Sequence, residues 1–282
     1  VKTIRKRIRV CLAGSAAVIR RISLPIMTHA ELKDAIRYEA ERHLPFAVDE
    51  CVLDFQILNQ IPHQSVMNVL LVAAQRSVIE AKLSMLGACG VTPESLDIDL
   101  FCLSNAFELF SDRTPADKSY ALLNIGHRSS LFVIVHETFP HYLREIPCGS
   151  LQVTQALADL KGIAEPEADR IKVEKPQAES SFLRQATEKG FERLVEEIKT
   201  AVDAFEAETA QKLSWTGLSG GGCGSQESES VLSAALGCRV SRWEASSHIK
   251  SGPHVVGDFL YKHSDEMSVC LGMAAAALGR LK

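Results

Sequence analysis

The sequence lacks an apolar run long enough to cross a membrane. Its longest candidate, Leu271 to Leu278, is well under half of the ~20 residues that a membrane-spanning helix needs. The basic stretch from Lys2 to Arg9 is not followed by an apolar segment of signal-peptide length, so we expect no secretion. These absences predict a cytoplasmic protein that reaches a membrane only through a partner.

An excess of positive charge is also missing. The chain has 31 Lys and Arg against 35 Asp and Glu, which gives a formal net charge of -4. Binding to nucleic acid or to an anionic membrane surface needs a strong cationic excess, so neither is expected as the main role. The 282 residues, 46% of them apolar, are enough for one large or two modest domains.

Familiar catalytic motifs are absent. The sequence contains no CxxC, HExxH, Walker A or nucleophile-elbow motif, and its nine histidines include no helical i, i+4 pair. Thiol-redox, metalloprotease, P-loop and serine-hydrolase functions therefore have no support. We predict no catalytic residue and no metal ligand.

The first third of the chain has the pattern of a small α+β unit. Two short strands are expected within Ile8 to Leu24, joined as a hairpin at Ala13 to Ser15. Thr28 and Glu31 have the spacing of a capping box, so a helix should begin there and end by Pro45.

Two strands and a helix are expected next. Odd positions from Cys51 to Leu58 are apolar, which predicts a strand with that side toward the core, and Val66 to Ala74 should be its buried neighbour. A helix from about Arg76 to Cys89 should end at Gly90, a typical C-cap residue.

The middle of the chain predicts a three-stranded meander. A short strand leads into a helix over Leu96 to Phe110. Three strands follow, at Tyr120 to Ile125, Leu131 to Val135 and Tyr142 to Ile146, and their short connections favour antiparallel pairing. A helix from Ser150 to Leu160 comes next.

The last part of the chain is expected to be mostly helical. We predict a surface loop between Gly162 and Pro176, a long charged helix from about Ser180 to Gln211, and a short strand at Trp215 to Leu218. A helix over Glu227 to Leu236 and a buried final helix over Met267 to Leu281 complete the prediction.

Two turns could approach an anionic ligand. Ser219 to Gly224 holds the densest glycine cluster and lies between a strand and a helix N-terminus, where backbone N–H groups can reach phosphate; a flexible turn without a chemical role is the alternative. The turn from Asn124 to Ser130 is either a second phosphate cradle or an ordinary β-turn. Asn124 is neutral where a carboxylate would help to hold magnesium, which argues against hydrolysis.

Several strings of the sequence resemble the PilM family of pilus assembly proteins, which is related to the division protein FtsA within the actin-like superfamily. In chain order they are Ala16 to Pro25, Ala35 to Glu41, Leu44 to Phe46, Asp54 to Leu58, Leu70 to Gln75, Asn124 to Gly126, Arg144 to Pro147 with Gly149, and Leu218 to Gly222. They extend over nearly the whole chain.

The resemblance implies a mixed α/β fold: an actin-like, ribonuclease H-like two-lobe fold with an inserted FtsA-type (SHS2-like) subdomain. Residues 1–92 would be a remnant of the first lobe plus the inserted subdomain, about 15–92. Residues 93–118 would hold the connecting helix of the first lobe. Residues 119–282 would form the second lobe, with a helical cap at about 149–212.

The resemblance also implies where ATP with Mg²⁺ would bind. Asn124, Gly126 and Ser129 resemble the second phosphate loop, and Gly220, Gly221 and Gly222 resemble the adenine-side glycine loop. Glu197 and Lys199 fall where the cap helix faces the nucleoside in the family.

The sequence departs from the family in two ways. The family usually opens with an Asp-x-Gly phosphate loop well ahead of the string that begins here at Ala16, so the sequence is either a fragment or has an incomplete first lobe. The family also usually has Asp where this chain has Asn124. Both departures predict weak or absent ATPase activity and make ATP and Mg²⁺ binding doubtful.

The function implied is that of a cytoplasmic scaffold for type IV pili and twitching motility. Such a scaffold binds the N-terminal tail of the inner-membrane protein PilN and contacts other pilus platform proteins, while self-association is left open. Tyr38, Leu44, Phe46 and Phe55 are the expected docking neighbourhood for the tail. The alternatives are an actin-fold ATPase or sugar-kinase relative, and the equivalent scaffold of a type II secretion or division complex.

Overall fold

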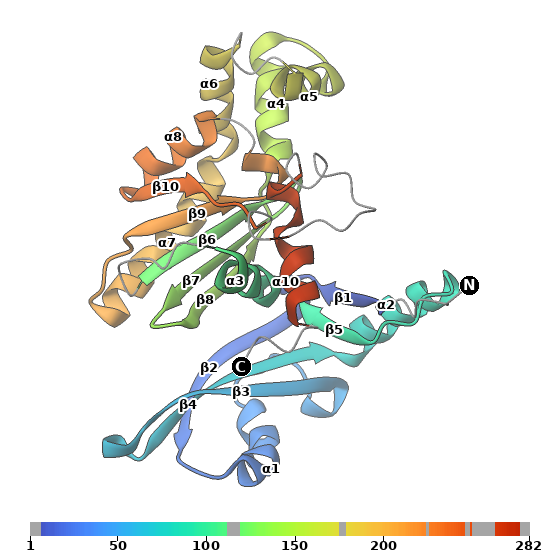
Figure 1. Ribbon diagram of the computed structural model, residues 1–282, viewed down its shortest axis with the longest axis vertical. Helices are drawn as coiled ribbons and strands as arrows, with labels where there is room; N and C mark the ends of the chain where they lie inside the picture. The colour runs from blue at the N-terminus through green and yellow to red at the C-terminus, as the bar shows by residue number, and fades with distance from the viewer. Residues whose placement is uncertain are drawn as a thin grey trace. The chain divides into compact units, whose positions relative to one another are not determined.

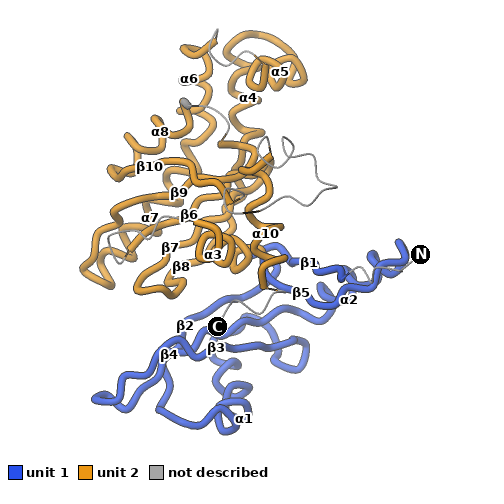
Figure 2. Tube along the Cα trace, in the orientation of Figure 1, with its two compact units in different colours: residues 1–98 blue, residues 99–282 orange. Residues whose placement is uncertain are grey.

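A computed structural model describes residues 7–111, 119–174, 179–223, 226–245, 249 and 263–276. The chain forms two compact units, residues 1–98 and residues 99–282 (Figure 2). The predicted domain boundaries fall after residues 92 and 118. That the segments between these boundaries are parts of actin-like lobes stays a prediction. In the described part of the chain, no helix combines the length and the apolar character that crossing a membrane requires.

Unit 1 is built on a three-stranded antiparallel sheet in the order β2-β4-β3. The strands are β2 (Ala17–Pro25), β3 (Cys51–Ile61) and β4 (Val66–Gln75). β4 lies in the middle and is the most buried strand, as its apolar sequence predicts. In β3 the odd positions face the core as expected until a bulge between Ile57 and Asn59, where the alternation shifts and Leu58 becomes buried.

Helix α1 (His29–Ala40) covers one face of this sheet. The capping box is confirmed: Glu31 N–H donates to the Thr28 hydroxyl at 3.3 Å, and Thr28 N–H donates to the Glu31 carboxylate at 2.8 Å. The helix buries Leu32, Ile36 and Ala40, spaced four apart, against the sheet.

The predicted hairpin between the first two strands is wrong, although both strands exist. β1 (Arg9–Leu12) pairs in parallel with β5 (Ser95–Ile98), whereas β2 pairs with β4. A short 3₁₀ turn at Gly14–Ala16 separates β1 from β2 and takes the chain from one sheet to the other. The apolar pattern identified the strands, but it carries no information about which strand each one pairs with.

Helix α2 (Arg76–Ala88) follows β4 directly and ends as predicted, with Gly90 in the left-handed region at φ +72°. All of its residues are described, and none of its side chains is buried. Leu83 and Met85 are 40% and 55% exposed.

Unit 2 contains a five-stranded sheet in the order β10-β9-β6-β7-β8. The predicted meander is confirmed by the antiparallel strands β6 (Ser119–Ile125), β7 (Ser130–His136) and β8 (Phe139–Ile146). β9 (Trp215–Ser219) pairs in parallel with β6, and β10 (Arg239–Arg242) pairs in parallel with β9. Strands β6, β9 and β10 therefore end at the same edge of the sheet.

Helices cover both faces of this sheet (Figure 1). On one face lie α4 (Ser150–Lys161), α6 (Ser180–Gly190), α7 (Glu192–Thr209) and α8 (Gln226–Leu236), which share an apolar core with the strands. On the other face is α3 (Asp99–Phe110). The Phe107 ring of α3 lies 5.0 Å from that of Tyr120 in β6 and 5.6 Å from that of Trp215 in β9.

Helix α10 (Ser268–Ala276) packs against α3 at very short range. A Cβ atom on Gly272 would overlap the carbonyl oxygen of Cys102 and lie 2.9 Å from the Ala106 nitrogen. The predicted burial of the final helix is therefore seen at this crossing. The last residues of the predicted range, 277–281, lie outside the described residues.

Two predictions about the helical part of unit 2 are wrong. The expected loop from Gly162 to Pro176 contains helix α5 (Glu165–Glu174); Pro166 stands in its first turn, where a missing N–H costs nothing, and Pro176 itself is not described. The expected long helix is two helices, α6 and α7, which meet at Gly190 and Phe191. A Cβ atom on Gly190 would lie 2.7 Å from the Val153 Cα atom, so the lack of a side chain there allows the end of α6 to approach α4 closely.

Candidate functional site

The two predicted glycine loops lie together at the carboxyl ends of β6 and β9. Asn124 and Ser219 are directly opposite each other in the parallel pairing, and the Asn124 side-chain amide donates to the Ser219 hydroxyl at 2.9 Å. Open α/β sheets bind ligands at the carboxyl ends of their strands, where strand order reverses. The fold therefore places the predicted loops where a ligand site is expected.

The glycines in these loops are required by packing between the loops themselves. Gly220 has φ +90°, and a Cβ atom on it would lie 2.7 Å from the Ile125 nitrogen. A Cβ atom on Gly222 would lie 3.0 Å from the Ile125 carbonyl oxygen and 3.1 Å from that of Gly126. Close backbone contact accounts for Gly220 and Gly222 without any ligand.

The N-terminus of α4 is capped from within the protein. Ser150 N–H donates to the Gly126 carbonyl at 2.9 Å, and Leu151 N–H donates to the His127 carbonyl at 2.8 Å. The preceding Gly149 N–H donates to the Gln152 side chain at 2.8 Å. An anion at this helix end would have to displace these bonds, although the helix dipole alone would favour it.

Ser129 is engaged inside the β6–β7 turn. Its hydroxyl donates to the Glu145 carboxylate of β8 at 2.7 Å. The Gly126 N–H donates to the Ser129 carbonyl at 3.0 Å, which closes the turn. The turn is therefore ordered by its own hydrogen bonds, as in the ordinary β-turn interpretation.

Glu197 and Lys199 point in different directions on α7. Glu197 is half-buried and forms a 3.0 Å ion pair with Arg144 of β8, whereas Lys199 is exposed. Residues two apart on an α-helix are separated by about 200° around its axis, so both cannot face one ligand.

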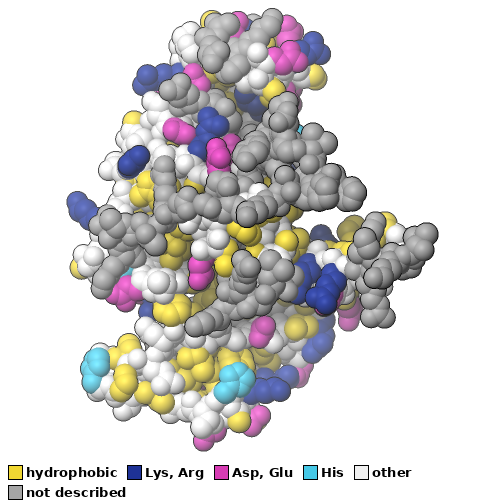
Figure 3. All heavy atoms as spheres, viewed as in Figure 1, with side chains coloured by type: hydrophobic (Ala, Val, Ile, Leu, Met, Phe, Trp, Pro, Cys, Tyr) yellow, Lys and Arg dark blue, Asp and Glu magenta, His cyan; other side chains and the backbone are white. Residues whose placement is uncertain are grey.

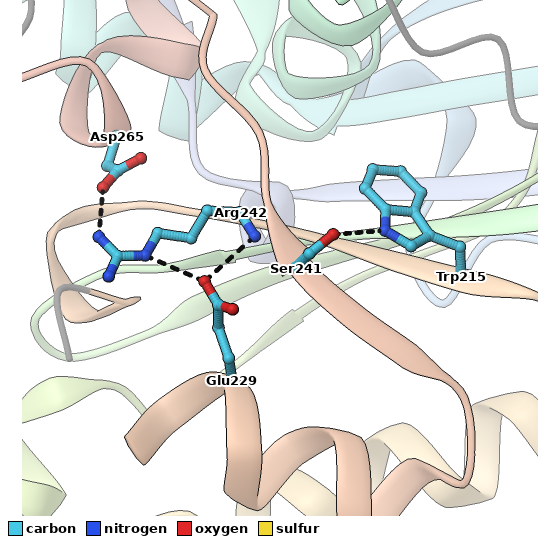
Figure 4. Close-up of polar contacts among 5 residues, drawn as sticks. All are labelled: Trp215, Glu229, Ser241, Arg242 and Asp265. Atoms are coloured by element: carbon cyan, nitrogen blue, oxygen red, sulfur yellow. Dashed lines mark hydrogen bonds and ion pairs between the residues drawn. The ribbon is translucent and has the colours of Figure 1, made fainter. Parts of the chain in front are cut away.

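Sequence reasoning missed a charged cluster beside the glycine loop. Arg242 ends β10, and its Nε atom donates to the Glu229 carboxylate of α8 at 3.1 Å while Nη1 lies 3.5 Å from the Asp265 carboxylate (Figure 4). The nearby Trp215 indole donates to the Ser241 hydroxyl at 2.8 Å and fixes β10 against β9. The sequence signal that could have identified strand β10 is Val240, which lies between two polar residues shortly after Gly237.

Burial controls the ionisation of this cluster. It raises the pKa of the Asp265 carboxyl, which the positive charge of Arg242 opposes. Burial also raises the pKa of the neighbouring Cys223 thiol, and the Asp265 charge adds to that effect. Cys223 is thus a neutral, unreactive thiol at neutral pH.

The arrangement as it stands does not fit ATP with Mg²⁺. The amide of Gly220 and those at the start of α4 already donate to protein acceptors, and Arg242 already pairs with two carboxylates. Asn124 offers an amide instead of the carboxylate that hydrated magnesium prefers. Within the described residues, no group of three or more His, Cys, Asp or Glu side chains could hold a metal ion.

The four predicted docking residues of unit 1 have unequal exposure. Tyr38 is 75% exposed and lies on the side of α1 away from the buried Leu32, Ile36 and Ala40. Leu44 and Phe55 pack against the edge of the α1 core, and Phe46 is half-buried. The Phe55 ring lies 5.2 Å from that of His29. Tyr38 therefore lies apart from the face on which Leu44 and Phe55 pack.

The family model of the type IV pilus assembly protein PilM matches residues 1–277. The chain belongs to the PilM family. The match extends through both compact units and includes the glycine loops and the charged cluster.

A solved structure of the PilM–PilN type IV pilus biogenesis complex contains a chain with the same fold. It superposes with a TM-score of 0.80 at 24% sequence identity, and the match covers 97% of this chain and 80% of that one. The predicted mixed α/β fold class is confirmed, and its actin-like character stays a prediction.

More distant similarity extends to two other solved structures. The ethanolamine utilization protein EutJ from Carboxydothermus hydrogenoformans has a TM-score of 0.46 and 16% identity, over 67% of this chain and 58% of EutJ. The cytoplasmic domain of EpsL, an inner-membrane component of the type II secretion system of Vibrio cholerae, has a TM-score of 0.42 and 12% identity, over 99% of this chain and 77% of EpsL.

Proposed function

We propose that this PilM-family chain is a cytoplasmic scaffold of type IV pilus assembly that binds the N-terminal tail of a PilN-like inner-membrane protein. Family membership supports the pilus role. The similarity to a chain from a PilM–PilN complex supports the partner. Through that tail, the scaffold would lie against the inner membrane without entering it.

The observation that carries the proposal is the structure of the unit 1 sheet and its exposed hydrophobic side chains. Its sheet has a helix against one face, and among the described strands β2 and β3 each pair with β4 alone, so each has one edge without a second strand beside it. Extended peptides bind such edges and neighbouring apolar pockets through backbone hydrogen bonds and a few side-chain anchors. Hydrophobic side chains gather on the surface of unit 1 (Figure 3), and Tyr38, Ile26 and Val52 are 75%, 40% and 43% exposed.

Catalysis is not needed for this role. Asn124, the engaged amides and the paired Arg242 all argue against turnover of ATP in this arrangement. An actin-fold ATPase or kinase, the main alternative, would show measurable hydrolysis. Nucleotide bound at the glycine loops would act on conformation.

Alanine substitutions at the docking residues test the proposal. The tail peptide of the PilN-like protein is titrated by calorimetry into wild type and into Tyr38→Ala, Leu44→Ala, Phe46→Ala and Phe55→Ala. Tyr38→Ala is the most informative variant, because replacing an exposed side chain should change the free energy of unfolding little. Val173→Ala, which removes a 69% exposed side chain from α5, is the control.

If the tail binds at this neighbourhood, the affinity for the tail peptide falls in one or more of the four variants and is unchanged in the control. Unchanged affinity in all four variants would reject the docking neighbourhood. Tight binding to the corresponding tail of a type II secretion or division protein, with none to the PilN-like tail, would favour the sister-scaffold alternative.

A further inference from the structure

One short turn makes two contacts with the glycine loop that follows β9 and one with Arg242 at the end of β10. The turn is η5 (Asp265–Met267), which directly precedes α10. Gly220 N–H donates to the Asp265 carbonyl at 2.7 Å. The Asp265 carboxylate lies 3.5 Å from Arg242, as Figure 4 shows, and the Glu266 Cγ atom lies 3.4 Å from where a Cβ atom on Gly221 would be.

The contacted groups are those that a phosphate would use. A backbone N–H after a strand, the open face of a glycine and a guanidinium are typical phosphate-binding groups. Here they meet a carbonyl oxygen from Asp265, the side chain of Glu266 and a carboxylate from Asp265. The turn thus presents oxygen acceptors and negative charge to the loop, as a bound phosphate would.

The turn is held in place by the rest of unit 2. The Ser268 hydroxyl donates to the Asp265 carbonyl at 3.2 Å, and the Glu266 carboxylate lies 3.2 Å from the His263 ring nitrogen. Beyond it, α10 is fixed against α3 at Gly272. A ligand that displaced the turn would have to break its contacts with Gly220 and Arg242 first.

We propose that η5 is an internal stand-in for phosphate, which closes the glycine loop so that ATP, or another phosphate-bearing nucleotide, binds only when the turn is displaced. This rests on the proposed function in one respect, because it assigns the glycine loop to nucleotide. It adds that Asp265 and Glu266 set the affinity, through competition for the same groups and through repulsion of the phosphates.

The test removes the competing charges and measures nucleotide affinity. ATP is titrated by calorimetry into wild type, into Asp265→Asn/Glu266→Gln, and into Glu196→Gln/Asp203→Asn. The last variant removes the same net charge from exposed positions of α7 and controls for general electrostatics. We expect the η5 variant to bind ATP on the order of tenfold more tightly than both other proteins, since a shared cation and an overlying carboxylate are released.

Equal affinity in the η5 variant and the control would overturn the proposal, as would the absence of ATP binding in every protein. If Asp265→Asn/Glu266→Gln does not fold, the ATP affinity of the single variant Glu266→Gln tests the proposal. Its side chain is 58% exposed, so we expect the fold to be kept, with a gain of about threefold. No gain in that variant would overturn the proposal.

Tail binding, measured on the same proteins without nucleotide, separates this inference from the proposed scaffold function. We expect all variants to bind the PilN-like tail as wild type does. If the η5 variant and wild type bind ATP equally and both bind the tail normally, the role of η5 is rejected and the scaffold function still stands. Absence of tail binding in wild type would reject the scaffold whatever ATP does.

Discussion

The Asn124 side-chain amide donates a 2.9 Å hydrogen bond to the Ser219 hydroxyl and so ties the end of β6 to the end of β9. The two residues are 95 positions apart in the chain, and Ser219 is fully buried. This bond joins the two loops that the sequence predicts to bind nucleotide. A carboxylate at position 124 would reverse the donor and acceptor.

The bond should contribute measurably to stability. Asn124→Ala leaves the Ser219 hydroxyl buried without this donor, which should cost about 1–2 kcal/mol of unfolding free energy. Urea unfolding of Asn124→Ala, Ser219→Ala and the double variant forms a double-mutant cycle. The double variant should be clearly less destabilised than the sum of the two single ones. Simple additivity would mean that the bond does not couple the loops.

Backbone contact at Gly220 makes a second prediction. Gly220→Ala should destabilise the protein by about 3 kcal/mol, because the residue has φ +90° and a new Cβ atom would press on Ile125. Gly237→Ala is the matched control: its φ is +65°, and a Cβ atom there has no atom within 4 Å, so only about 1 kcal/mol of strain is expected. Equal losses in urea unfolding would show that loop packing does not require Gly220.

The α3–α10 crossing predicts a similar contrast. Gly272→Ala should lower the unfolding free energy by about 3 kcal/mol, because the new Cβ atom would overlap the Cys102 carbonyl. Gly87→Ala, on α2 with open space around it, should raise stability by about 0.5–1 kcal/mol. A neutral Gly272→Ala variant in thermal and urea unfolding would contradict the close crossing.

Local signals in the sequence predicted the local structure well. The Thr28 and Glu31 capping box, the alternation in β3 and the meander of β6 to β8 each depend on neighbours in the chain, so the sequence carries them directly. The glycine loops were also placed correctly at strand ends. Whether nucleotide contacts these loops stays a prediction.

Long-range relationships could not be predicted in the same way. The partner of β1 is β5, more than 80 residues away, and nothing in the alternation of β1 specifies it. Helix α5 buries only Ala168 fully, so its apolar pattern was too weak to identify. The contact of Asp265 with Arg242 depends on β10, a strand of 4 residues, and on a turn far along the chain.

A salt bridge in the α4–α5 region makes a prediction about pH. The hydrogen bond from Lys172, at 2.8 Å, holds the pKa of the Asp169 carboxyl below its usual value. A lowered pKa in the folded state stabilises the protein above the unfolded-state pKa of about 3.9, and that stability is lost as pH falls through the folded-state pKa.

Lys172→Met should therefore cost about 0.5 kcal/mol at neutral pH, a value reduced by solvent because Asp169 is 53% exposed. The difference from wild type should shrink below pH 4. Lys189→Met, which removes an exposed lysine 4.0 Å from Asp159, is the control and should change little. Thermal unfolding from pH 7 to pH 3 measures both. A difference that grows as pH falls would contradict the assignment.

The most direct test of the scaffold role is the affinity of the wild-type chain for the tail of its PilN-like partner. Calorimetry compares a synthetic peptide of that tail with a scrambled peptide of the same composition, which controls for charge and for nonspecific binding. The account predicts saturable one-to-one binding of the true tail, none of the scrambled one, and about tenfold weaker binding to at least one of the four docking variants. Equal binding of both peptides, or no binding of either, would contradict it.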